Sequence, residues 1–112
     1  MSVIRFFSEA AGEVIMLRST VEPVFKQAGI IFHDQGAFLS EDLAVFMEKI
    51  QRTIDRLVQF EVVPKEENEE ELDEEKKQKR KDFVALRIRF YPLMDLLQKA
   101  QKKGKHVHWT TL

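Results

Sequence analysis

The segment from Pro64 to Lys81 places the strongest constraint on the fold, because almost nothing in it can enter a hydrophobic core. Residues 66–75 hold eight acidic side chains, residues 76–81 hold five basic ones, and Leu72 is the only apolar residue after Pro64. A segment of this composition buries too little apolar surface to offset the entropy that is lost on ordering. We therefore predict a charged flexible linker at about residues 64–76.

The rest of the chain has the composition of one globular domain. The protein has 112 residues, of which 44% are hydrophobic and nine are phenylalanine, so residues 1–112 can build a single core. Residues 66–81 hold five of the 18 basic and eight of the 19 acidic residues, which leaves an excess of only two bases elsewhere. That charge is too small to favour binding to nucleic acid.

Cysteine content and hydropathy bear on the cellular compartment. The chain has no cysteine, which excludes disulfides, thiolate metal sites and a cysteine nucleophile, and which fits a reducing environment. Charged side chains interrupt the first twenty residues, and no stretch approaches the roughly 18 apolar residues of a membrane span. We expect a soluble, cytoplasmic protein without a membrane segment or a cofactor.

Two apolar runs near the N-terminus, residues 3–7 and 14–17, predict a β-hairpin. The single Gly12 precedes a β-branched strand, whereas a phosphate-binding loop needs several glycines followed by a helix. We therefore expect a turn here and no anion site, with Gly12 supplying the positive φ that closes the turn.

The length of the hairpin loop decides which side chains share a face. The apolar face that a four-residue loop creates consists of Ile4, Phe6, Ile15 and Leu17. A three-residue loop would bring Val14 and Met16 to this face instead, in a row that ends on Arg18. We favour the four-residue loop, which turns Val14 and Met16 to the opposite face.

Three segments space their apolar residues as amphipathic helices do. The first is capped by Thr20 and ends at Gly29, and the second is capped by Ser40. The third begins in the mid-seventies and ends at Gly104, while residues 30–39 are predicted to form a connecting loop. The apolar stripe of the second helix consists of Leu43, Phe46, Met47, Ile50, Ile54, Leu57 and Val58.

The residues from Lys105 to Thr110 alternate between polar and apolar, which predicts a last strand with Val107 and Trp109 on one face. This strand must pair with the hairpin, because an isolated hairpin is only marginally stable. We expect Trp109 to be buried against Phe6. The sequence thus predicts an α+β domain, in which the N-terminal hairpin and the C-terminal strand form a small three-stranded sheet with three helices packed mainly on one face.

One pattern of residues runs along nearly the whole chain. It consists of Phe6, Ser8, Ala10, Ala11, Val14, Ile15, Met16, Gly36, Leu43, Arg89, Pro92, Leu93, Val107 and Trp109. This pattern resembles a family of short bacterial proteins catalogued as domain of unknown function 1840. The resemblance supports the predicted fold and implies no known activity, cofactor or partner.

His106 and His108 form a candidate metal site, because residues two apart on a strand leave the same face. A third ligand could come from His33 or Asp34. Polar residues on an open sheet face explain the same pair without a metal, and we favour that explanation.

Candidates for anion binding and catalysis are fewer. Arg87 and Arg89 point about 200° apart on a helix, so they cannot clamp one anion unless the helix is bent. No spacing of serine, histidine and acid indicates a nucleophile, so we expect no enzymatic activity.

The sheet face opposite the helices is the second candidate site. The interface residues predicted on it are Arg5, Phe7, Val14 and Met16, beside the two histidines. Aromatic, methionine and arginine side chains are enriched in the cores of protein interfaces. We therefore expect a non-enzymatic protein-interaction module, which could form a homodimer or bind a protein partner through this open face. The alternative is a metal-binding or small-ligand-binding domain that uses His106 and His108.

Overall fold

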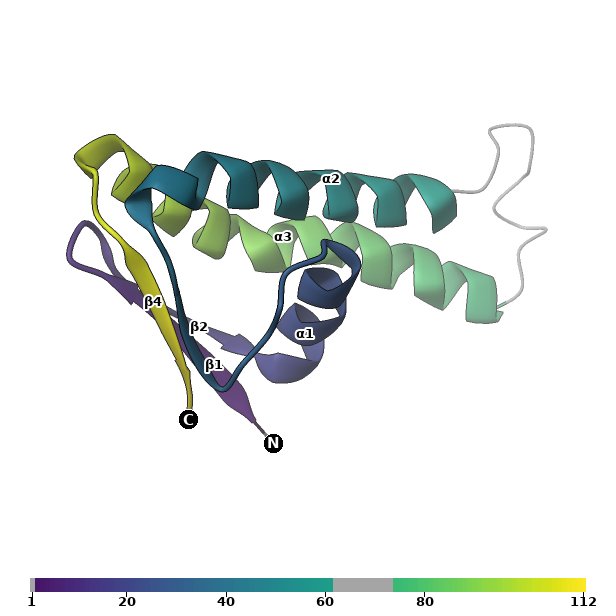
Figure 1. Cartoon of the computed structure of the whole chain (residues 1–112). Helices are drawn as coiled ribbons and strands as arrows, with labels where there is room; N and C mark the ends of the chain where they lie inside the picture. Colours follow the sequence, from purple (N-terminus) through teal and green to yellow (C-terminus); the bar gives the residue numbers. More distant parts are fainter. Residues whose placement is uncertain (1, 62–73) are drawn as a thin grey trace.

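Four strands and three α-helices make up the described part of the chain (Figure 1). The structure is a computed structural model that describes residues 2–61 and 74–112, with side chains for residues 2–58 and 85–112. The elements are β1 (Val3–Ser8), β2 (Gly12–Leu17), α1 (Arg18–Gln27), β3 (Gln35–Phe38), a 3₁₀ turn (Ser40–Asp42), α2 (Leu43–Glu61), α3 (Glu74–Lys103) and β4 (Val107–Thr111). The predicted linker lies outside these residues, apart from 74–76, which begin α3.

The predicted α+β class and the three helices are confirmed, but the sheet has four strands instead of three. All neighbouring strands are antiparallel, and their order across the sheet is β2-β1-β4-β3. The C-terminal strand pairs with the hairpin through β1, as predicted. β2 and β3 are therefore the two edges of the sheet, and Figure 1 shows the helices gathered on one side of it.

The additional strand, β3, lies within residues 30–39, where the sequence predicts a loop. It pairs with β4 so that Gly36 is opposite Trp109 and Phe38 is opposite Val107. Of its four residues, only Phe38 is a large apolar side chain, so the segment has no alternating pattern from which a strand could be predicted.

The hairpin has the three-residue loop, so the predicted register is wrong. Phe6 is opposite Val14, Ile4 is opposite Met16, and Ser8 is opposite Gly12, which has a φ of 82°. The row of apolar side chains on this face of the hairpin does not end on Arg18. The strand β2 ends at Leu17, and Arg18 is already the first residue of α1. The turn itself and the positive φ are as predicted.

The helices lie where their apolar spacing predicts them, but two of the predicted caps are wrong. α1 begins at Arg18 without a side-chain cap, two residues before Thr20. Ser40 begins the 3₁₀ turn that leads into α2, and no side-chain cap is formed there either. The mid-seventies start of α3 and its end just before Gly104 are confirmed.

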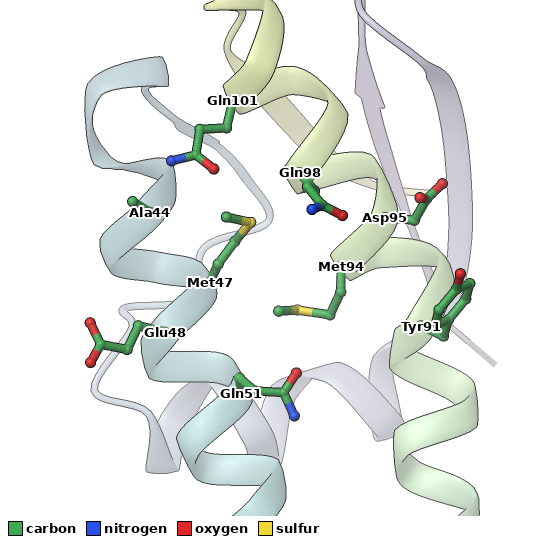
Figure 2. Close-up of a pocket in the computed structure, with 9 residues that line it drawn as sticks. All are labelled: Ala44, Met47, Glu48, Gln51, Tyr91, Met94, Asp95, Gln98 and Gln101. Carbon is green, nitrogen blue, oxygen red and sulfur yellow. The ribbon is translucent and has the colours of Figure 1, made fainter.

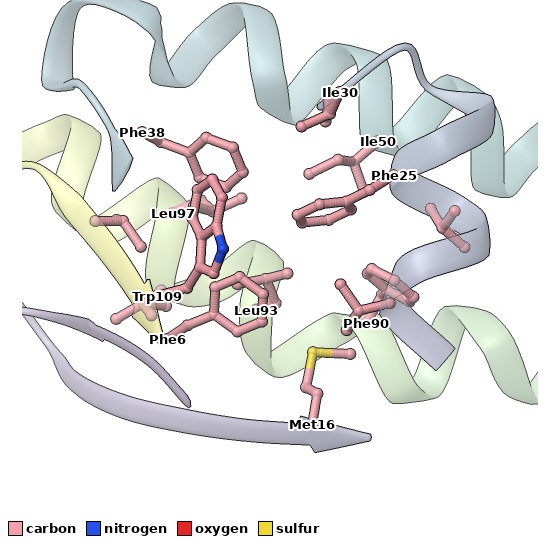
Figure 3. Close-up of a cluster of buried hydrophobic side chains, with 14 of the residues drawn as sticks. Phe6, Met16, Phe25, Ile30, Phe38, Ile50, Phe90, Leu93, Leu97 and Trp109 are labelled. Carbon is pink, nitrogen blue, oxygen red and sulfur yellow. The ribbon is translucent and has the colours of Figure 1, made fainter. Parts of the chain in front are cut away.

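The core lies between the sheet and the helices (Figure 3). Trp109 is 5% exposed, and the centre of its indole is 6.4 Å from that of Phe6, which confirms the predicted contact. The indole N–H donates a 2.9 Å hydrogen bond to the carbonyl of His33. The helices contribute Phe25, Ile50, Phe90, Leu93 and Leu97 to the same cluster.

Gly36 makes room for this tryptophan. A Cβ atom at Gly36 would lie 2.2 Å from Cζ2 of Trp109, closer than atoms that are not bonded can approach. Because Gly36 has no side chain, the indole ring of its cross-strand partner Trp109 can lie against β3. The indole there contacts Phe38, whose ring centre is 4.9 Å away.

Candidate functional site

The sheet face away from the helices holds a stack of three side chains from β1 and β4. The guanidinium carbon of Arg5 lies 4.5 Å from the centre of the Phe7 ring. The Phe7 ring also stacks on His108, which is opposite it in the strand pairing, with ring centres 5.5 Å apart. The guanidinium of Arg5 also pairs with the carboxylate of Glu13 on β2. The predicted positions of Arg5 and Phe7 on the open face are thus correct.

The predicted positions of Val14 and Met16 are wrong. Met16 is 7% exposed in the core, and Val14 packs against the core from the same side. The three-residue loop brings Ile15 and Leu17 to the open face in their place, where they are 55% and 42% exposed. The sequence is compatible with this three-residue loop, but we favoured the four-residue loop from the sequence alone.

β2 has a free outer side, and the hydrogen bonds at its end show which backbone groups point there. The N–H of Arg18 donates to the carbonyl of Ser2, so this pair bonds across β1 and β2. Bonded and non-bonded pairs alternate along antiparallel strands. The N–H and C=O groups of Glu13, Ile15 and Leu17 therefore point away from β1.

A hollow of about 210 Å³ adjoins this free side. It is lined by Ile15, Met16, Leu17, Thr20 and Arg89. The other arginine of the predicted pair, Arg87, bonds instead to Asp55 on α2 at 3.3 Å. The two arginines thus lie on different surfaces of the molecule, as their spacing predicts.

The two histidines lie near each other without forming a set of metal ligands. Their ring centres are 6.4 Å apart, and both line a hollow of about 410 Å³. Nδ1 of His106 accepts a 2.8 Å hydrogen bond from the N–H of Ser40, so in the neutral ring the other nitrogen carries the proton. That leaves neither nitrogen of His106 free to bind a metal while this bond holds.

The third ligands considered from the sequence are at the far end of the strand pair. The carbonyl of Asp34 accepts a hydrogen bond from the N–H of Thr111, whereas His106 precedes β4 at its other end. His33 and Asp34 are therefore not brought to the two histidines. Among the described residues, no group of three or more His, Asp or Glu side chains could hold a metal ion.

A shallow groove of about 480 Å³ runs between α2 and α3 on the side away from the sheet (Figure 2). Met47 and Met94 point into it from the two helices. The carboxylates of Glu48 and Asp95 at its rim are each paired with a base one turn away, at 2.7 and 2.9 Å. The lining therefore offers thioether and amide groups but no activated nucleophile.

The described helices also bear on membrane insertion. Within residues 2–61 and 74–112, no helix is both long enough and apolar enough to cross a lipid bilayer.

The described residues define a class, a small α+β domain with a four-stranded antiparallel sheet whose helices are on one face. The particular family follows from the sequence, because residues 2–109 match the model of the family described as Domain of unknown function (DUF1840). The chain therefore belongs to this family. No curated protein and no solved structure matches the chain.

Proposed function

We propose that this protein is a non-enzymatic protein-interaction module that associates with a second copy of itself through the exposed residues of β1 and β2. The exposure of Ile15 and Leu17 beside the stacked Arg5 and Phe7 carries the proposal. Contiguous apolar side chains on a surface mark interaction sites, and arginine and aromatic residues are typical of interface cores.

The charges of this surface support a second copy as the partner. The acidic Glu13 and the basic Arg5 are paired within one chain. An identical surface therefore meets no excess of like charge when it approaches. The absence of cysteine supports a reducing cytoplasm as the place where this association occurs.

Metal or small-ligand binding at His106 and His108 has less support. The hollow that both histidines line favours it. The hydrogen bond from Ser40 to Nδ1 of His106 opposes it, because a metal would have to displace that bond.

Sedimentation velocity over a range of protein concentrations tests the proposal. We expect the native chain to form dimers as its concentration rises, and Ile15→Lys to weaken the dimer by about tenfold or more, because it places a charge in the interface. The matched control is Ala37→Lys, which adds the same charge at an exposed residue of the opposite edge strand and should leave the dimer intact. A native chain that stays monomeric at high micromolar concentration would contradict the proposal.

A further inference from the structure

We infer that two copies join along their β2 strands, so that two four-stranded sheets become one continuous antiparallel sheet with its two-fold axis at Ile15. This inference rests on the proposed function and specifies it, because the open face could also bring two copies together face to face. The partner is a second copy of this chain, and the main contact consists of hydrogen bonds between the two backbones.

The backbone of β2 directs hydrogen-bonding groups outward along the proposed contact. Glu13, Ile15 and Leu17 direct their N–H and C=O groups away from β1, and within residues 2–61 and 74–112 β2 pairs with no other strand. All three residues are exposed. Among the described residues no hydrogen bond to these outward groups is formed, so an added strand would satisfy them.

The spacing of the three outward residues selects one register. When Ile15 faces its own copy, Glu13 of each chain faces Leu17 of the other, and the three bonded pairs supply roughly six hydrogen bonds. A register centred on Met16 pairs Ile15 with Leu17 but places Glu13 opposite Ser19, which is already in α1. That register keeps two bonded pairs, so the axis at Ile15 is favoured.

Side chains and charges agree with this register. On the open face the two Ile15 side chains meet at the axis. On the inner face Val14 lies opposite Met16 of the second copy, so that the partly buried Val14 gains apolar contact. The two Glu13 carboxylates lie at opposite ends of the contact, each beside an Arg5 of its own chain.

Apart from the charge of Glu13, β2 lacks the features by which edge strands avoid pairing. Such strands are usually very short or carry lysine, proline or an inward charge. β2 has six residues with neither lysine nor proline, and its inward side chains Val14 and Met16 are apolar. The other edge strand, β3, has only four residues.

Proline substitutions test the edge contact. The N–H of Ile15 points away from β1, so Ile15→Pro removes no bond within the chain but blocks the added strand. Ala37→Pro is the matched control, because the N–H of Ala37 points outward from β3 in the same way. We expect Ile15→Pro to weaken the dimer by about tenfold or more and Ala37→Pro to leave it unchanged, with circular dichroism confirming that both fold.

Single cysteines test the register in a chain that has none of its own. At the axis the two Cα atoms of residue 15 would be about 5.5 Å apart, within the range of a disulfide. Those of residue 17 would be about 14 Å apart. We therefore expect Ile15→Cys to form a disulfide-linked dimer on mild oxidation, and Leu17→Cys, which is similarly exposed, to remain uncrosslinked.

The outcomes separate the two proposals. A monomeric native chain overturns the proposed function and this inference together. A native dimer that survives Ile15→Pro but is lost with Phe7→Ser overturns the edge contact alone and indicates a face-to-face dimer. Equal crosslinking of Leu17→Cys and Ile15→Cys would overturn the register.

Discussion

The sheet ends in two edge strands whose side chains have different environments. β3 places Phe38 in the core at 1% exposure and holds Gly36 beneath the indole of Trp109. β2 places Met16 in the core but leaves Ile15 and Leu17 about half exposed on the opposite face. The difference indicates that β3 is a part of the core, whereas Ile15 and Leu17 of β2 form an exposed apolar surface.

The aromatic cluster explains this difference. Rings from α1, β3 and the loop between them surround Trp109, and these are Phe25, Phe32 and Phe38. On the β2 side the chain turns directly into α1 at Arg18, and Ile15 and Leu17 stay exposed on the open face. Substitutions on the two sides should therefore differ in which property they change.

The largest effect is expected on the β3 side, from Trp109→Ala. The substitution removes a buried indole with its hydrogen bond to His33, so the free energy of unfolding should fall by about 3 to 5 kcal/mol. Chemical denaturation measures this change. A variant that melts within about 2 °C of the native chain would show that the cluster is not central to the fold.

A smaller loss is expected from Gly36→Ala. The new methyl group would collide with Cζ2 of Trp109, and moving the ring should cost about 1 to 3 kcal/mol. Near-ultraviolet circular dichroism should show the changed environment of the indole. The control is Ala37→Ser at the neighbouring exposed position, and equal stability of the two variants would contradict the close contact.

The smallest effect on folding is expected from Leu17→Ser on the β2 side. This side chain is 42% exposed, so its loss should change the free energy of unfolding of the single chain by less than about 1 kcal/mol. Thermal unfolding at low protein concentration measures it without a contribution from association. A loss of stability as large as that of Trp109→Ala would show that Leu17 contributes to the core. The two edge strands would then not differ in the way described above.

Much of the fold could be predicted from apolar spacing alone. The regular spacing of apolar residues predicts the stripe of α2, the buried face of Val107 and Trp109, and the end of α3 before Gly104. A chain of this length can bury residues with that spacing in only a few arrangements. β3 could not be predicted, because its pairing depends on a glycine that accommodates the indole of a distant strand. That contact is visible only when both strands are in place.

The candidate site was predicted only in part. Arg5 and Phe7 belong to the open face in either register, whereas the choice between Met16 and Ile15 depended on one residue of loop length. Arg18 counted against the correct register because the N-cap of α1 was predicted at Thr20, three residues after the observed N-cap Leu17. The free side of β2 follows from the strand order, which short-range patterns do not contain.

Amide hydrogen exchange at several protein concentrations tests the central claim most directly, because it reports on each N–H of β2 separately. Val14 and Met16 bond to β1 and should be protected at every concentration. The amides of Ile15 and Leu17 should exchange rapidly in dilute protein and slow as the concentration rises, while Ala37 on β3 stays rapid. Exchange at Ile15 that does not change with concentration would contradict the pairing of two copies along β2.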